Sequence, residues 1–238
     1  MTGMREPLRV AVAQPVCVAY DVAVNARTHA AAVRAAAARL VVFPELSLTG
    51  YELDAPAMTA DDPCLAPLVE ACAEMGSVAL VGAPIEAEAG RSHIGMLAVT
   101  GGGATVAYRK MWLGAEEARR FSPGDQPAVL DVDGWRLGLA ICKDIGVPQH
   151  ASETAALGMD VYVAGILEAA EDAAIQDERA RRVVRDHQVW VAVASFAGST
   201  GGGYAQAAGC SAIWTPGGVR IAQAGPEPGG IARATLSS

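Results

Sequence analysis

The chain has 238 residues, about half of them hydrophobic, which is enough to bury one large core, so we expect a single domain over residues 1–238. Its 18 Lys and Arg against 26 Asp and Glu give a formal charge of -8, which disfavours nucleic acid and anionic membranes as partners. Five cysteines without a C-x-x-C pair indicate reduced thiols. Because no apolar run reaches the length of a signal peptide or a membrane span, we expect a soluble cytoplasmic protein.

The first half of the chain alternates short β-rich runs with alanine-rich stretches, which is typical of an α/β protein built in layers. Asn25 is the predicted N-cap of the first helix, and the second strand is expected to stop at Pro44-Glu45. In chain order the pattern predicts a strand at 8–14, a helix at 24–39, a strand at 40–45, a helix at 63–75 and a strand at 77–84.

The second half continues the same alternation, with hairpins added. The pattern predicts hairpins at 96–110, 128–144 and 210–225, helices at 150–158 and 172–187, and strands at 159–165 and 189–196. The glycines at 201–203 indicate a mobile loop, not a domain boundary. No repeat of fixed period is found. We expect two mixed sheets forming the core with helices outside them, a four-layer α-β-β-α sandwich.

Three residues at predicted strand ends carry side chains suited to catalysis. Glu45 ends an apolar run, where desolvation would raise its pKa towards that of a general base. Cys142 stands between a strand and a polar turn, a place that exposes a nucleophile. Lys110 would lower the thiol pKa and stabilise an oxyanion if it lay beside the sulfur. Singly, each has a plainer interpretation as a solvated strand end or an inert buried thiol.

The flanking residues of these positions form three ordered blocks: VVFPELSLTGY, YRKMWLGAEEARRFSPGD and GLAICKDIGVP. Together they closely resemble the nitrilase superfamily of carbon-nitrogen hydrolases, and the resemblance extends from VAVAQP near the start to SAIWTPGGVRIAQAG near the end. It implies that Glu45 is the general base, Lys110 the catalytic lysine and Cys142 the nucleophile. The second glutamate of the family falls on Glu117, which keeps its spacing to Phe121 and the following Pro-Gly.

The resemblance implies hydrolysis of a small amide or N-carbamoyl amine through a thioester, without a cofactor. Lys110 and the backbone N–H of Lys143 would hold the oxyanion, and Glu117 would hold Lys110 or the substrate amine. No metal is expected, because the four histidines show no ligand-like spacing.

This chain departs from the family pattern at several positions that bear on the substrate. Lys143 replaces a common aromatic residue and could meet an anionic substrate or point into solvent, and Gly146 replaces an arginine found in many members. Ser195 and Phe196 suggest a changed pocket wall. The candidate substrate-binding residues are therefore Lys143, Tyr51, Ser195 and Phe196. Because the chain stops at IARATLSS, short of the family's C-terminal arm, we expect a homodimer and not a higher oligomer.

Three alternatives remain open from the sequence. The same three residues could hydrolyse a nitrile to an acid, or the fold could serve as a non-catalytic binding module. A cysteine hydrolase with His150 or His187 as its base is a further possibility. Replacing Glu45 by Gln separates the last from the glutamate-dependent mechanism, because a Cys-His pair would survive the change.

Overall fold

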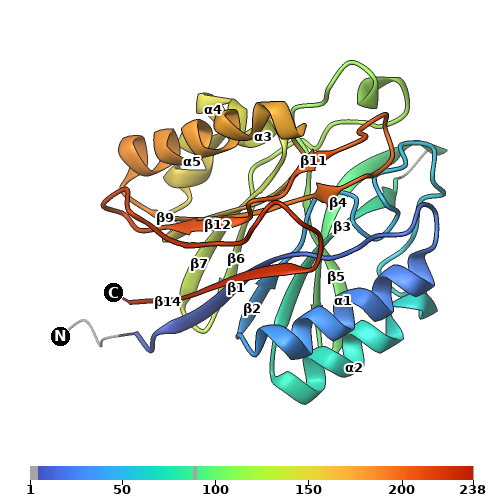
Figure 1. Cartoon of the computed structure of the whole chain (residues 1–238), viewed down its shortest axis with the longest axis horizontal. Helices are drawn as coiled ribbons and strands as arrows, with labels where there is room; N and C mark the ends of the chain where they lie inside the picture. The colour runs from blue at the N-terminus through green and yellow to red at the C-terminus, as the bar shows by residue number, and fades with distance from the viewer. Residues whose placement is uncertain (1–4, 88–89, 238) are drawn as a thin grey trace.

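Two six-stranded sheets pack face to face in the computed structural model, which describes residues 5–87 and 90–237 (Figure 1). The first sheet has the order β14 (Gly230–Leu236), β1 (Leu8–Gln14), β2 (Leu40–Val42), β3 (Val78–Glu86), β4 (Ser92–Thr100) and β5 (Gly103–Arg109). The second has the order β13 (Arg220–Gln223), β12 (Ala212–Trp214), β9 (Trp190–Ser195), β8 (Val161–Ile166), β7 (Trp135–Ile141) and β6 (Val129–Val132). A separate two-stranded pair consists of β10 (Ala197–Gly198) and β11 (Ala207–Ala208).

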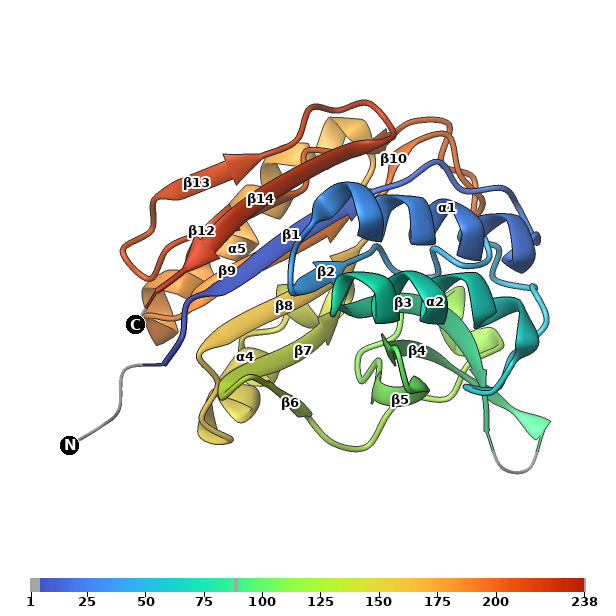
Figure 2. The same ribbon diagram turned by 90° about the horizontal axis from the view of Figure 1, so that it is seen from below.

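Helices cover the outer side of each sheet. The first sheet carries α1 (Val22–Ala36) and α2 (Ala66–Met75), which lie side by side in Figure 2. The second carries α3 (Lys143–Gly146), α4 (Pro148–Ala156) and α5 (Ala173–His187). Short 3-10 turns occur at η1 (Pro63–Leu65), η3 (Glu117–Arg119) and η4 (Ala170–Asp172). The predicted four-layer sandwich is confirmed.

Both sheets are mixed, and they share one pattern of strand directions. In each, two parallel pairings join three central strands, β1-β2-β3 in the first and β7-β8-β9 in the second. On one side of these three strands lies one antiparallel strand, β14 in the first sheet and β6 in the second. On the other side lie two further strands joined by antiparallel pairings, β4 and β5 in the first sheet and β12 and β13 in the second. The corresponding strand ends therefore meet at the same edge of the sandwich, where parallel strands commonly place functional loops.

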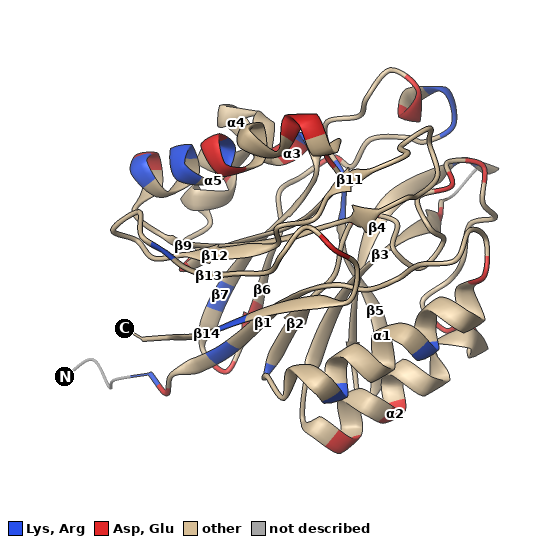
Figure 3. Cartoon of the chain, in the orientation of Figure 1, with Lys and Arg blue, Asp and Glu red and all other residues tan. Residues whose placement is uncertain are grey.

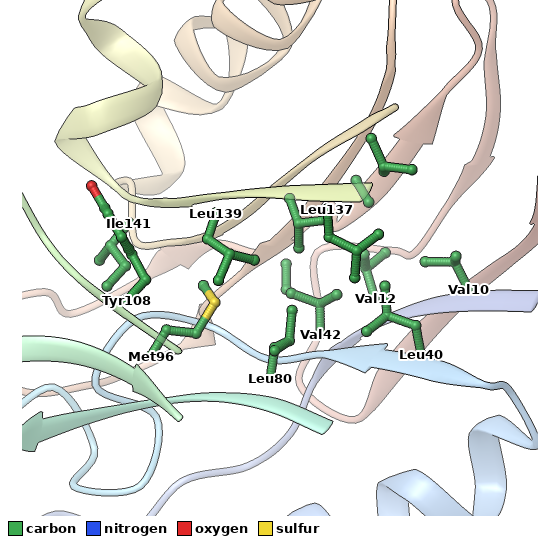
Figure 4. Close-up of a cluster of buried hydrophobic side chains, with 14 of the residues drawn as sticks. Val10, Val12, Leu40, Val42, Leu80, Met96, Tyr108, Leu137, Leu139 and Ile141 are labelled. Atoms are coloured by element: carbon green, nitrogen blue, oxygen red, sulfur yellow. The ribbon is translucent and has the colours of Figure 1, made fainter. Parts of the chain in front are cut away.

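The two sides of each strand pack against different layers because successive side chains point to opposite faces. Val10 and Val12 of β1 face the opposite sheet, where they join Leu137 and Leu139 of β7 in the central core (Figure 4). The intervening Ala11 packs with the residues of α1 instead. Larger side chains thus fill the space between the sheets, and small ones let α1 lie close to the first sheet.

The structure corrects the predicted start of the first helix. Its N-cap is Asp21, whose carboxylate accepts a hydrogen bond from Val24 N at 2.9 Å. Asn25 lies inside the helix and is fully buried, and its amide donates to the carbonyls of Val18 and Leu48 at 2.7 and 2.9 Å. Asn25 therefore ties the loop after β1 to the loop after β2. Asn and Asp both favour the N-cap position, and here Asp21 occupies it while the tertiary contacts bury Asn25 inside the helix.

The last strand, β14, was not predicted. It pairs antiparallel with β1 along its whole length, from Leu8 opposite Leu236 to Gln14 opposite Gly230. Exposed Arg233 and Thr235 alternate with small or buried residues along it, so the segment lacks the apolar run that marks the other strands. The last strand of the structure thus lies beside the first.

Candidate functional site

Glu45 lies just beyond β2, in a segment that passes between the two sheets. Two glycines make room for this backbone: a Cβ on Gly82 of β3 would lie 2.3 Å from Leu46 N, and one on Gly165 of β8 would lie 2.5 Å from Phe43 O. Leu46 adopts a left-handed φ of 49°, which turns the chain sharply after the glutamate. The Glu45 side chain is consequently buried where the strands of both sheets end.

The carboxylate of Glu45 has one paired and one unpaired oxygen. Its Oε1 accepts from Lys110 Nζ at 2.7 Å, whereas its buried Oε2 has no hydrogen-bond partner among the described residues. Burial raises the pKa of Glu45 to about 7, although the ammonium of Lys110 lowers it. A carboxyl group with this pKa can both accept and return a proton near neutral pH.

Lys110 follows β5 directly and is held by backbone bonds on both sides. Its N–H donates to Ile94 O at 2.8 Å, and its carbonyl accepts from Gly124 N at 2.7 Å. Its side chain is 1% exposed and donates to Glu45 and to Glu117, each at 2.7 Å. Burial alone would lower the pKa of Lys110, but the nearby anionic groups outweigh it and the pKa is raised. The ammonium is therefore a fixed positive charge.

Glu117, on η3, is the second carboxylate on this lysine. Its Oε2 accepts from the backbone N–H of Gly114 at 2.6 Å, and its Oε1 lies 3.4 Å from the hydroxyl of Tyr51, which donates to it. These contacts fix the carboxylate from two further directions. The structure thus brings Glu45, Lys110 and Glu117 together as the resemblance implied.

Cys142 stands between β7 and α3 with φ 43° and ψ −100°, an unusual conformation for a residue with a side chain. Its N–H donates to Gly165 O at 3.0 Å, and its thiol donates to Leu167 O at 3.3 Å. The thiol is close enough to Glu45 and Lys110 for each to act on its pKa. In this structure, however, its hydrogen bond goes to Leu167 and not to Glu45.

The thiol pKa differs from the expectation drawn from Lys110 alone. Lys110 lowers the pKa of Cys142, as predicted, but burial and the charge of Glu45 outweigh it, so the pKa lies well above its usual value. The resting sulfur is therefore a protonated thiol, and a thiol in this state becomes a good nucleophile only when a base takes its proton. The Glu45 carboxylate is one of the groups whose charge acts on this thiol.

Asp144, two residues after the cysteine, connects the two halves of the site. Its buried carboxylate accepts from Ile141 N at 3.0 Å on β7, and from Trp112 N at 2.9 Å and Tyr108 OH at 2.8 Å on the segment that carries Lys110. Burial raises its pKa to about 6. Sequence reasoning did not assign this residue a role, although it stands in the GLAICKDIGVP block.

His150 and His187, the two histidines considered as an alternative base, are both unfavourably placed for that role. Both ring nitrogens of buried His150 are engaged by tyrosine hydroxyls, Nε2 by Tyr108 at 2.9 Å and Nδ1 by Tyr162 at 2.7 Å. Burial lowers the pKa of His150 to about 4, so the ring is neutral. His187 ends α5, and this helix leads into the start of β9, the opposite end of the sheet from Cys142. This arrangement argues against a Cys-His pair.

A cavity of about 260 Å³ adjoins Glu117. Its lining includes Tyr51, Leu53, Gly202 and Tyr204. The ring of Tyr51 packs edge-on against Phe196 and against Tyr204, with centroids 6.2 and 5.7 Å apart. Tyr51 thus lines the cavity, whereas Phe196 packs against Tyr51 without lining it, and a role for either in substrate binding stays a prediction. Tyr204, which follows the glycine run, also lines the cavity and was missed by sequence reasoning.

Two of the predicted substrate-binding residues are engaged elsewhere. Lys143 is exposed and donates from Nζ to Leu113 O at 2.7 Å, so its ammonium is turned to the surface loop. Ser195 is buried and links strands: its N–H donates to Ser211 Oγ at 2.9 Å, and its own hydroxyl donates to Phe196 O at 3.3 Å. Neither residue lines the cavity.

Comparison with known proteins places this site in a family. A family model described as carbon-nitrogen hydrolase matches residues 9–238. The chain belongs to the carbon-nitrogen hydrolase family. A hydrolase from the pqqF 5′ region of Pseudomonas protegens is 30% identical over 92% of this chain and 79% of its own length. An (R)-stereoselective amidase from a Pseudomonas species is 34% identical over 52% of this chain and 46% of its own length.

Solved structures of the nitrilase superfamily share the fold of this hydrolase. Nit3 of Saccharomyces cerevisiae, a member of branch 10 of that superfamily, superposes with a TM-score of 0.86 at 21% identity, covering 98% of this chain and 91% of its own. An amidase from Nesterenkonia sp. gives a TM-score of 0.85 at 23% identity, covering 100% and 92%. Family and fold together make this chain an amidase-like carbon-nitrogen hydrolase, as the resemblance predicted.

Two further expectations concern metal sites and membrane-spanning helices. Among residues 5–87 and 90–237, no group of three His, Cys, Asp or Glu side chains is arranged to hold a metal ion, and chemistry without a metal stays a prediction. No helix in the same part of the chain combines the length and the apolar character needed to cross a membrane.

Proposed function

We propose that this hydrolase cleaves small amides, with N-carbamoyl amines as close variants, through a thioester on Cys142. Glu45 moves the protons, Lys110 holds the oxyanion, and Glu117 fixes the lysine. The observation that carries this proposal is the buried contact of Lys110 with Glu45 and Glu117 beside a protonated thiol. A solved variant of the Nesterenkonia amidase, in which acrylamide has added to the active-site cysteine, supports the same nucleophile position.

In the first half-reaction the sulfur attacks the carbonyl carbon of the amide. The thiol proton leaves Leu167 O and passes to the unpaired Oε2 of Glu45. The carbonyl oxygen becomes an oxyanion beside the Lys110 ammonium and the N–H of Lys143. That N–H is free to bind it, because the first N–H groups of a helix have no partner within the helix.

The tetrahedral adduct then collapses and the carbon-nitrogen bond breaks. Glu45 returns its proton to the departing nitrogen, which leaves as ammonia or an amine, and a thioester remains on Cys142. In the second half-reaction Glu45 takes a proton from water as the water oxygen attacks the thioester. The carbon-sulfur bond breaks, the acid departs, and the thiol regains its proton. Each fixed oxyanion donor is typically worth about 3–4 kcal/mol in the barrier.

Mass spectrometry of the intact protein tests this proposal directly. After incubation with a panel of small amides, N-carbamoyl amines and nitriles, we expect acid products and a transient acyl adduct on Cys142. Glu45→Gln should lower turnover by about 10²–10⁴-fold, the usual contribution of a general base. Cys64→Ala is the matched control for Cys142→Ala, since it removes another free thiol, the one on η1.

Two results would contradict the mechanism. The first is undiminished turnover in Cys142→Ala, and the second is an acyl adduct on another cysteine. A folded protein with neither turnover nor adduct on any substrate of the panel would favour the non-catalytic binding module.

A further inference from the structure

We propose that Glu168, held by Arg179, is a specificity-determining residue of this site and makes the enzyme reject substrates whose acyl group carries a carboxylate. This inference rests on the proposed function, since it concerns the substrate of the same cysteine.

Glu168 is placed beside the nucleophile by the backbone. It directly follows Leu167, whose carbonyl accepts the Cys142 thiol hydrogen at 3.3 Å. Its own carbonyl accepts from Ala208 N at 2.9 Å, which fixes the residue between the end of β8 and β11. Its side chain is only 14% exposed. The carboxylate therefore has a defined position at the edge of the site.

Arg179 of α5 supplies the counter-charge. Its Nη1 donates to Glu168 Oε1, while Oε2 has no hydrogen-bond partner among the described residues. Charged residues of both signs colour α5 in Figure 3, and Arg179 is the one that reaches this carboxylate. A Cβ on Gly146 would lie 3.2 Å from Arg179 Nε, so a larger residue at 146 would crowd the guanidinium. Many family members carry an arginine at the position of Gly146. Here the guanidinium of Arg179 lies beside that position, and it is already paired with Glu168.

The charge of Glu168 reaches the reacting sulfur. Its carboxylate raises the pKa of the Cys142 thiol, and that of Tyr204 on the cavity wall. The cations near the site are already occupied: Lys110 by Glu45 and Glu117, and Arg179 by Glu168. Lys143 is turned to the Leu113 carbonyl.

A substrate carboxylate would therefore enter a region with more acidic than basic groups and would displace an existing ion pair to find a cation. Specificity obtained by like-charge repulsion is a common device in binding sites. A neutral acyl chain meets no such penalty, and an ammonium group could be accepted by the unpaired Oε2 of Glu168. The favoured substrates are accordingly neutral or cationic amides.

Three amides of similar length test this selection at pH 8: butanamide, its ammonium analogue 3-aminopropanamide, and its carboxylate analogue succinamate. In the wild type we expect kcat/KM for succinamate to be at least tenfold below that for butanamide. Glu168→Gln should raise the succinamate-to-butanamide ratio about tenfold. The control Glu171→Gln, which removes an exposed charge three residues further on, should change it less than twofold.

A second measurement needs no turnover. We expect Cys142 to be alkylated faster by neutral iodoacetamide than by anionic iodoacetate, with the ratio falling in Glu168→Gln and rising in Arg179→Met, where the carboxylate is uncompensated. An unchanged ratio in both variants, or wild-type hydrolysis of succinamate as fast as of butanamide, overturns the proposal. If no amide reacts but the alkylation ratio still changes in the variants, the result contradicts the proposed hydrolysis and supports the inferred effect of the Glu168 charge at Cys142. Should Glu168→Gln not fold, Arg179→Met alone decides.

Discussion

Replacing Lys110 by Met should destabilise the protein strongly, and more so at alkaline pH. The substitution keeps a chain of similar length but leaves Glu45 and Glu117 without their shared cation, which donates to each at 2.7 Å from a side chain that is 1% exposed. Breaking a buried ion pair from one side costs about 3–5 kcal/mol. In a chain of this size each kcal/mol lowers the melting temperature by about 2–4 °C, so we expect a decrease of roughly 6–20 °C.

The pH dependence of this loss follows from Glu45. Burial raises its pKa to about 7, so its contribution to the free energy of unfolding is present below its ordinary pKa and is lost as pH rises through 7. Lys110 lowers that pKa, so its removal raises the pKa further and extends the loss to higher pH. At pH 5.5 the carboxyl of Glu45 is protonated and neutral, so the loss of the Lys110 ammonium beside it costs less free energy of unfolding. The Lys110→Met decrease should therefore be smallest at pH 5.5 and largest at pH 8.5.

Thermal unfolding of wild type and variants at pH 5.5, 7.0 and 8.5, followed by circular dichroism, measures this effect. The chain has only two lysines, and the other provides a matched control. Lys143→Met removes an exposed ammonium and should change the free energy of unfolding by about 0.5 kcal/mol or less at every pH. A Lys110→Met protein as stable as wild type at pH 8.5, or one destabilised equally at all three pH values, would refute this reasoning.

Three further results are expected. The rate constant kcat/KM should rise with pH through about 7, because Glu45 must be ionised to accept the thiol proton; a pH-rate profile that is flat between 5.5 and 8 contradicts this. Tyr162→Phe should cost about 1–2 kcal/mol in urea unfolding, since it leaves Nδ1 of buried His150 without its partner, and a loss below 0.3 kcal/mol would count against that contact. Amine-reactive labelling of the folded protein followed by peptide mapping should modify Lys143 and spare Lys110, and equal labelling of both would show that Lys110 is accessible.

Much of the site could be predicted because its residues stand at strand ends within ordered blocks. Glu45, Lys110 and Cys142 each follow an apolar run, and such runs were assigned correctly as β2, β5 and β7. Glu117 was implied by the family resemblance, whose spacing it keeps, and the structure places it on Lys110. The layers also followed from the alternation of strand and helix patterns.

The remaining features depend on contacts between distant parts of the chain. Arg179 pairs with Glu168 because Gly146 leaves space, and neither residue has a local pattern that marks it. The raised thiol pKa of Cys142 results from burial, which no local sequence reveals. Lys143 follows Cys142 in sequence, but its ammonium is turned to the Leu113 carbonyl.

The proposed reacting groups come from different sheets: Glu45 and Lys110 follow strands of the first, and Cys142 follows a strand of the second. Each sheet alone therefore holds an incomplete set. A partly folded molecule with both sheets formed but separated would show native-like circular dichroism and no hydrolysis. During refolding, the time at which activity returns would consequently mark the docking of one sheet on the other. Hydrolysis itself can therefore be used to follow that step.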